Sequence, residues 1–211
     1  AAEHEPEDRQ VLRRAEMCAA LVATGLGIAP DTIAAVLARF GSDHGDNPGR
    51  LQRWILGGDV QVYVDYAHNP DGLHNLLTLV RQAMSEGGRL HLLLGQAGNR
   101  TNEAIAELAA TAAAFEPDHV VLKDMDGYLR GRESGEVANV LREALLRHGV
   151  AEDAIVECLD EAGAARLILA AARPGDSLVL PVHGATGRSQ VRALLDELQA
   201  RRWAAGMPLP P

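Results

Sequence analysis

Short apolar runs alternate with longer amphipathic stretches along most of the chain. Six apolar runs of four to six residues predict strands at Leu51–Leu56, Val60–Val64, Leu90–Leu94, His119–Leu122, Ile155–Cys158 and Ser177–Val182. Five stretches between or after them carry apolar residues three and four positions apart, which predicts helices at Pro70–Met84, Asn102–Ala114, Gly135–Arg147, Glu161–Ala172 and Arg188–Arg201. The same helical spacing appears twice before the first strand, at Arg9–Gly25 and Asp31–Phe40.

Two strands followed by a regular alternation of helix and strand predict an α/β fold. Parallel neighbours need crossover helices, so we expect an open, mainly parallel sheet with helices on both faces. The segment from Gly57 to Asp59 is a hairpin signal, which predicts one antiparallel strand. The segment Gly41–Gly49 has the composition of a linker. We therefore divide the chain into two helices with a linker (1–48), a sheet domain (49–202) and a tail (203–211), in which the segment GMPLPP at 206–211 is expected to be disordered.

The overall charge narrows the range of partners. The chain has 211 residues, with 20 basic against 29 acidic side chains and a net charge of −9. This balance argues against general binding of nucleic acid, which favours a basic face. No apolar run approaches the roughly 20 residues of a membrane span, and the acidic first residues do not have the pattern of a signal peptide. We predict a cytoplasmic protein with neither nucleic-acid nor membrane partners.

The cysteines and the charged residues give no sign of a metal centre. Cys18 and Cys158 are far apart, and each lies in an apolar run, so we predict two buried thiols in a reducing compartment. The spacing of His and acidic residues indicates no metal site. A phosphate-binding G-x-x-x-x-G-K-[ST] segment is also absent from the sequence, and Lys123, the only lysine, could not belong to one.

The segment Val60–Leu73, which reads VQVYVDYAHNPDGL, carries the clearest candidate chemistry. Asp65, His68 and Asn69 stand where a predicted strand ends and Pro70 opens a helix. Ligands of open α/β sheets bind at the carboxyl ends of strands, so these side chains are candidates for binding. The alternative is a structural turn with a helix N-cap. We expect the ends of four strands to bring Asp65, Gly95, Asp124 and Val182 to one edge of the sheet.

Three other turns contain candidate residues. Arg50 follows the linker, and an arginine there could bind phosphate or ribose oxygens, although a surface role is the simpler alternative. The turn Gly95–Arg100 offers glycines whose backbone N–H groups could meet an anion. The turn His183–Arg188 could face a phosphate or a substrate, or could be a plain turn with Thr186 as the N-cap.

The segment Lys123–Glu136 gathers charges of both signs after a predicted strand. Most charge runs of this kind are solvated loops, and that alternative stays open. Opposite charges at the end of a strand also suit an amino-acid substrate, whose carboxylate an arginine can bind with two hydrogen bonds. Arg130, Arg132 and Glu136 are the candidates that this interpretation favours.

Four of these strings together resemble the C-terminal domain of the Mur ligase superfamily. They are P-G-R at 48–50, D-Y-A-H-N-P at 65–70, G-Q-A-G-N-R at 95–100 and L-R-G-R-x-x-G-E at 129–136. The last is similar to a motif of cyanophycin synthetases. Asn99 stands where the family usually has Asp. The resemblance implies a Rossmann-like sheet and two groups of site residues: nucleotide-binding Arg50, Asp65, His68 and Asn69, and substrate-binding Arg100, Asp126, Arg130, Arg132 and Glu136.

Ligases of this superfamily use ATP and Mg²⁺ to form an amide bond between an acid and an amino acid. The resemblance implies that residues 1–48 are the remnant of a central ATPase domain. The chain would then be the C-terminal nucleotide- and amino-acid-binding domain of such a ligase, inactive without the P-loop domain and with no catalytic residue of its own. Its expected partners are ATP or ADP, an amino acid or peptide, the upstream ATPase domain and a second copy of the chain.

Two other functions remain as alternatives. The same sheet could belong to a stand-alone module that binds a nucleotide or an amino acid without chemistry. A dinucleotide-dependent oxidoreductase is disfavoured, because no G-x-G-x-x-G follows the first strand with an acidic residue about 20 positions later.

Overall fold

The computed structural model describes residues 17–38, 49–125 and 127–211. The chain divides into two compact units, Ala1–Pro48 and Gly49–Pro211. The first unit contains a helix over residues 17–25 and helix α2 (Pro30–Leu37). Proline suits the first turn of a helix, which explains why α2 begins at Pro30, one residue before the predicted start. The remainder of the two predicted helices, at residues 9–16 and 39–40, lies outside the described residues.

The first unit leaves apolar side chains on its surface. Met17, Leu21 and Leu26 are largely exposed, and α2 has no buried residue. An apolar groove of about 190 Å³ runs between its two helices. The helical spacing of the sequence therefore identified the apolar faces of these two helices, but it does not show what covers those faces.

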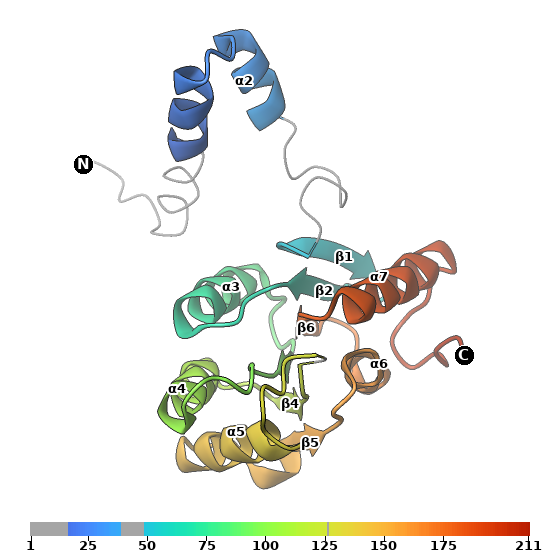
Figure 1. The fold of residues 1–211 in the computed structure, drawn as a ribbon. Helices are drawn as coiled ribbons and strands as arrows, with labels where there is room; N and C mark the ends of the chain where they lie inside the picture. Colours follow the sequence, from blue (N-terminus) through green and yellow to red (C-terminus); the bar gives the residue numbers. More distant parts are fainter. Residues whose placement is uncertain (1–16, 39–48, 126) are drawn as a thin grey trace, which may run out of the picture. The chain divides into compact units, whose positions relative to one another are not determined.

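The second unit is built on a six-stranded sheet in the order β1-β2-β6-β3-β4-β5 (Figure 1). Its strands are β1 (Gln52–Leu56), β2 (Val60–Asp65), β3 (Leu90–Leu94), β4 (His119–Leu122), β5 (Ile155–Glu157) and β6 (Ser177–Pro181). β1 is antiparallel to β2, and every other pair is parallel. Gly58 and Asp59 both have positive φ in the turn that joins β1 to β2. The predicted open, mainly parallel sheet with one antiparallel strand is confirmed.

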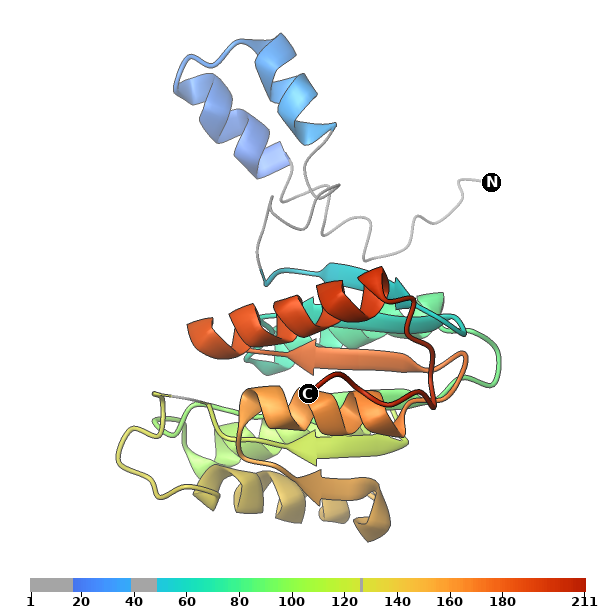
Figure 2. The ribbon, with the colours of Figure 1, turned by 90° about the vertical axis from the view of Figure 1, so that its right-hand side faces the viewer.

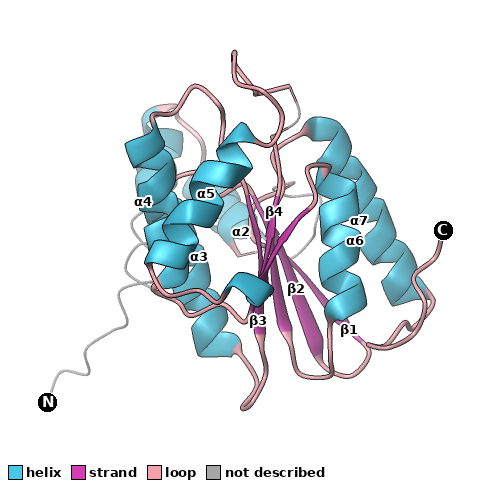
Figure 3. Cartoon of the chain, turned by 90° about the horizontal axis from the view of Figure 1, so that it is seen from below, coloured by secondary structure: helices cyan, strands magenta, loops and turns pink. Residues whose placement is uncertain are grey.

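Helices cover both faces of this sheet (Figure 3). They are α3 (Pro70–Ala83), α4 (Asn102–Ala113), α5 (Glu136–Arg147), α6 (Glu161–Ala171) and α7 (Ala185–Ala200), with a short 3₁₀ turn at Glu152–Ala154. α3, α4 and α5 share one apolar core with Tyr63 and Leu92, whereas α6 and α7 share the other with Val62 and Leu93. Neighbouring residues of one strand thus enter opposite cores, which explains why the strands read as continuous apolar runs.

A buried polar cluster lies at the amino ends of β3, β4 and β6. Asp176, which is 2% exposed, accepts hydrogen bonds from the Arg89 side chain (2.7 Å), the Arg173 backbone N–H (2.8 Å) and His91 Nε2 (2.8 Å). His91 Nδ1 lies 3.2 Å from His119 Nδ1 on the neighbouring strand. Burial acts to raise the pKa of Asp176, but these donors outweigh it and lower the pKa to about 2.

The tail and the two cysteines differ from their predictions. The segment after α7 is ordered: Trp203 is buried, its backbone oxygen accepts from Gly57 N (2.9 Å), and its Nε1 donates to the Met207 oxygen (2.9 Å). An aromatic side chain packed beside the edge strand holds the tail in place. Cys18 is exposed and Cys158 only half-buried, because an apolar run does not reveal which of its positions point inward.

The start of α7 also differs from its prediction. The helix begins at Ala185 with Gly184 as its N-cap, so Thr186 lies inside the helix and is not a cap. Arg188, the predicted start, is therefore in the first turn. Among the described residues, no helix is both long and apolar enough to cross a membrane.

Candidate functional site

The carboxyl ends of four neighbouring strands form one edge of the sheet. Val182 N donates to the Asp65 oxygen (3.0 Å), which places the ends of β6 and β2 side by side. Lys123 N donates to the Leu94 oxygen (2.9 Å), which does the same for β4 and β3. Figure 2 shows the sheet behind α6 and α7. The predicted meeting of these strand ends at one edge is confirmed, and most of the candidate residues follow them.

Arg50 and His68 lie against the ring of Tyr66, and Asp65 binds the segment beside Arg50. Asp65 Oδ2 accepts a hydrogen bond from Leu51 N (2.7 Å), which ties the segment before β1 to the end of β2. The guanidinium of Arg50 lies 4.9 Å from the centre of the Tyr66 ring. His68 meets the same ring edge-on at 5.4 Å, and its Nδ1 lies 3.0 Å from the Tyr66 oxygen. The structure thus brings together three of the four predicted nucleotide-binding residues.

Asn69, the fourth of them, has a structural role. Its side chain is the N-cap of α3 and accepts from Gly72 N at 2.8 Å. The capping alternative therefore accounts for the Asn69 oxygen. Gln96 Nε2 donates to the His68 oxygen (2.8 Å), so the turn after β3 supports the loop after β2.

Arg132 joins the two loops that carry the predicted substrate-binding residues. Its guanidinium donates to the oxygens of Gly98 (2.9 Å) and Arg100 (2.8 Å) and to Asn102 Oδ1 (2.8 Å). It also pairs with Glu136 at 2.8 Å. All four of these hydrogen bonds are to the protein, so this guanidinium holds the two loops together.

The other predicted substrate-binding residues stand apart from this clamp. Arg130 is exposed, has a φ of 52°, and lies 5.0 Å from the centre of the Tyr128 ring. Arg100 is exposed as well. Asp126 lies outside the described residues. Arg130 and Arg100 are therefore the exposed guanidinium groups of this region that could meet a carboxylate.

Gly98 marks the closest approach of the two loops. Its N–H donates to the Tyr128 oxygen (2.8 Å), and a Cβ built on Gly98 would lie 1.9 Å from the Leu129 oxygen. We expect Gly98→Ala to force the loops apart and to lower the free energy of unfolding by about 1–3 kcal/mol. Urea unfolding measures this, with Gly25→Ala as the control, because a Cβ there meets nothing within 4 Å. Equal unfolding midpoints for the two variants would contradict the close contact.

Sequence reasoning missed a fully buried ionic cluster beneath the site. Lys123, Glu161 and His183 come from the ends of β4, α6 and β6, and the side chains of all three are 0% exposed. Lys123 Nζ donates to Glu161 Oε1 and lies 3.0 Å from His183 Nδ1. Glu161 also accepts from His183 N and Gly184 N, both at 2.8 Å. The one available signal was a single lysine placed directly after an apolar strand.

The contacts of this cluster determine its protonation states. His183 Nε2 lies 2.9 Å from the Ala67 oxygen, so Nε2 must carry the proton and Nδ1 accepts from the Lys123 ammonium. Burial lowers the pKa of His183, which favours this neutral form. Burial would raise the pKa of Glu161, but hydrogen bonds from His183 and the charge of Lys123 reverse the shift. The cluster is thus an ion pair plus a neutral imidazole that supports the loop after β2.

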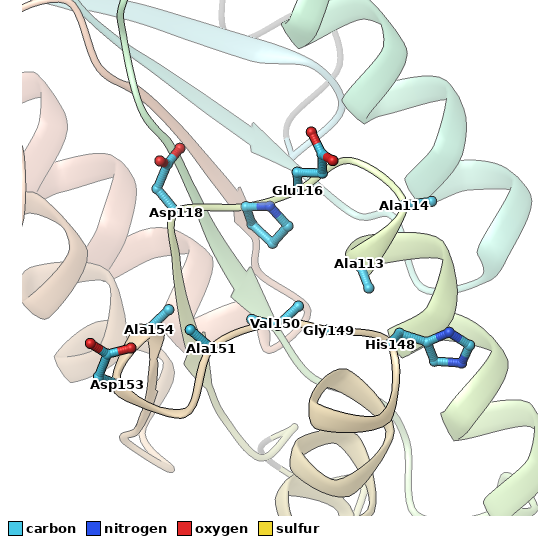
Figure 4. A pocket seen from close by; sticks show the side chains of 11 residues that line it. Ala113, Ala114, Glu116, Asp118, His148, Gly149, Val150, Ala151, Asp153 and Ala154 are labelled. Carbon is cyan, nitrogen blue, oxygen red and sulfur yellow. The ribbon is translucent and has the colours of Figure 1, made fainter.

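A wide hollow lies elsewhere, at the amino ends of β4 and β5. It measures about 570 Å³ and is lined by the connections that follow α4 and α5 (Figure 4). Glu116, Asp118 and Asp153 lie around it, and Asp118 already accepts a hydrogen bond from Leu90 N (2.8 Å). None of the sequence motifs reaches it. The described residues also contain no group of three His, Cys, Asp or Glu side chains that could hold a metal ion.

Comparison with known proteins identifies the family. The model of the Mur ligase glutamate ligase domain matches residues 49–181, which is more than half of the chain. The chain therefore belongs to the Mur ligase family through this C-terminal domain, and the resemblance noted in the sequence is confirmed at that level.

Curated relatives point the same way. The UDP-N-acetylmuramoyl-L-alanyl-D-glutamate–2,6-diaminopimelate ligase of Prochlorococcus marinus is 32% identical over 138 residues, covering 65% of this chain and 26% of that protein. The ligase of the same name from Geobacter metallireducens is 32% identical over 179 residues, covering 78% of this chain and 33% of that protein. The chain thus spans about a third or less of these two relatives.

Solved structures share the fold. FolC of E. coli, in complex with DHPP and ADP, has a TM-score of 0.53 and 24% identity, covering 88% of this chain and 38% of that one. The UDP-N-acetylmuramate-alanine ligase MurC of Thermotoga maritima has a TM-score of 0.53 and 14% identity, covering 80% and 36%.

Proposed function

We propose that the chain is the nucleotide- and amino-acid-binding C-terminal part of an ATP-dependent, amide-bond-forming ligase, of the cyanophycin-synthetase type. The observation that carries this proposal is that Arg50 and His68 both contact the Tyr66 ring at the carboxyl edge of the sheet, where Asp65 binds the backbone next to Arg50. The L-R-G-R-x-x-G-E string supports the cyanophycin-type branch. The relatives support the ligase chemistry, because they are named as ligases of UDP-N-acetylmuramoyl-L-alanyl-D-glutamate and 2,6-diaminopimelate.

The nucleotide is proposed to bind at the Tyr66 end of the edge. An arginine beside an aromatic ring can bind phosphate with two parallel hydrogen bonds. Asp65 Oδ2 holds Leu51, and so fixes the backbone next to Arg50. In this proposal Asn69 acts as the N-cap that fixes where α3 begins, and His68 contacts the Tyr66 ring.

The amino-acid substrate is proposed to bind at the other end, beside the loops joined by Arg132. Arg100 and Arg130 are exposed there and can bind a carboxylate. Arg132 and Glu136 are proposed to act by positioning these loops. Asp126 is kept as a candidate for the amino group of the substrate because of its charge and place in the sequence.

The preceding ATPase domain is proposed to supply the P-loop and the Mg²⁺ ligands, because phosphoryl transfer requires both. Residues 1–48 would belong to that domain. The exposed apolar side chains of Met17, Leu21 and Leu26 support this part of the proposal, since an unburied apolar face favours a partner. A reaction that consumes ATP also favours the cytoplasm.

Steady-state kinetics of the intact ligase test whether the nucleotide and the amino acid bind at opposite ends of this sheet edge. Arg50→Ala or Asp65→Ala should raise the KM for ATP or lower kcat. Arg130→Ala should raise the KM for the amino acid by about 10- to 100-fold and leave the KM for ATP nearly unchanged, because it removes a charge-assisted hydrogen bond. The 211-residue chain alone serves as the inactive control. A change in only the ATP constants for Arg130→Ala would contradict the proposal.

A further inference from the structure

Two guanidinium groups lie against the ring of Tyr66, and the four strings that resemble the family contain only one of them. Arg50 lies 4.9 Å from the centre of its ring, and Arg188, from the first turn of α7, lies 5.3 Å from the same centre. Both distances fall within the range of a cation–π contact. Two segments that are more than 130 positions apart in the chain thus bring positive charge to one ring.

The charge of these two arginines is not neutralised within the described structure. Neither Arg50 nor Arg188 forms an ion pair with any described carboxylate, although the whole chain carries a net charge of −9. Two later arginines of α7 differ in this respect: Arg192 pairs with Asp196 and Arg201 with Glu197. Because like charges repel, two unpaired guanidinium groups at one ring favour an anion between or beside them.

The N-terminus of α7 adds to the positive potential. The helix has 16 residues, its N-cap Gly184 makes no side-chain cap, and its first turn contains no acidic residue. A helix N-terminus carries a partial positive charge within its first turn, where Arg188 also lies. Glu161 approaches this turn from the buried side and accepts from Gly184 N at 2.8 Å.

Arg188 is held in place before any ligand binds. Its guanidinium donates a hydrogen bond to the His183 oxygen. Its side chain passes so close to Gly49 that a Cβ built there would lie 2.7 Å from Arg188 Cδ. Gly49 directly precedes Arg50, so the same close approach brings the backbone beside Arg50 next to the Arg188 side chain. A preorganised pair of this kind loses less entropy on binding than two free side chains would.

We propose that Arg188 is a further anion-binding residue, and that Arg50 and Arg188 together bind a phosphate group of the nucleotide beside Tyr66. This inference rests on the proposed nucleotide function of the edge. The planar guanidinium fork matches the oxygens of a phosphate, and both forks lie against the same Tyr66 ring. The sequence left open whether the turn His183–Arg188 faces a phosphate or is a plain turn, and Arg188 is the residue of that turn to which we assign the phosphate.

The experiment titrates the 211-residue chain with ADP and, separately, with inorganic pyrophosphate, followed by calorimetry at low salt. Arg188→Gln and Arg50→Gln should each weaken both ligands by about tenfold or more, because each removes a charge-assisted contact. Arg188→Lys keeps the charge but loses the planar fork. Its affinity for both ligands should therefore lie between that of the wild type and that of Arg188→Gln. Arg192→Gln removes the same charge one turn further along α7 and should change affinity less than twofold. Thermal unfolding checks that each variant is folded.

The two ligands separate this inference from the proposed function. If ADP binds and Arg188→Gln binds it equally well, the role of Arg188 is refuted while nucleotide binding stands. If pyrophosphate binds in an Arg188-dependent way but ADP does not, the anion site stands and the nucleotide function of the chain fails. Equal losses for Arg188→Gln and Arg192→Gln would show a general charge effect and overturn the inference, as would the absence of binding by either ligand.

Discussion

Replacing Lys123 with methionine should lower the free energy of unfolding by about 3–5 kcal/mol. Methionine has a similar length but no charge, so Glu161 would stay buried without the ammonium that lies between it and His183. An unpaired buried carboxylate is far more costly than the loss of an exposed ion pair. Urea unfolding followed by circular dichroism measures the change.

Two further variants separate the charge effect from other causes. Arg192→Met removes a positive charge from an exposed pair with Asp196 and should cost no more than about 1 kcal/mol. Adding Glu161→Gln to Lys123→Met should recover part of the loss, because the unpaired charge is then gone. If Lys123→Met costs no more than Arg192→Met, the ion pair does not stabilise the fold as we infer.

Asp176→Asn should lower the free energy of unfolding by about 3 kcal/mol at neutral pH. The aspartate receives donors from Arg89, Arg173 and His91, so an amide NH₂ in its place would face another donor. Asp196→Asn is a matched control, because its carboxylate is about half exposed. Similar losses for the two variants would contradict the importance of the buried cluster.

The difference between wild type and Asp176→Asn should also depend on pH. The pKa of Asp176 is lowered from 3.8 to about 2, so the folded state favours the ionised form. That preference contributes about 2 kcal/mol above pH 4, and the contribution is lost as the pH falls from about 4 to about 2. Asparagine cannot titrate, so the two stabilities should converge over this range. A constant difference would contradict the lowered pKa.

The fold could be predicted from the sequence because its signals are local and consistent. Each buried strand is a continuous apolar run, and the glycines between β1 and β2 mark the one antiparallel pair. Helical patterns lie between the later strands, and such crossover helices are the connections that parallel strands need. The tail was mispredicted because its order depends on the burial of Trp203 against a distant strand, which composition does not reveal.

The candidate site was predictable only in part, because its contacts join distant segments. A strand end indicated Asp65 and the P-G-R string indicated Arg50, but no local pattern links Lys123 to Glu161, 38 positions later. Arg132 looked like a substrate-binding residue from its charge, whereas its hydrogen bonds to Gly98 and Arg100 show how the loops are joined. Charge identifies the candidates, and only the tertiary structure shows which of them already have partners.

The burial of Lys123 makes it a chemical reporter of unfolding. All other positive side chains of the chain, apart from histidines, are arginines, which amine-reactive esters do not modify at neutral pH. Lys123 has a side-chain exposure of 0% and is paired with Glu161. In the folded protein the Lys123 amine is out of reach of such a reagent, so acylation of Lys123 requires that the sheet edge opens. The rate of that acylation, read by mass spectrometry, therefore measures how often the interior of this domain is exposed to solvent.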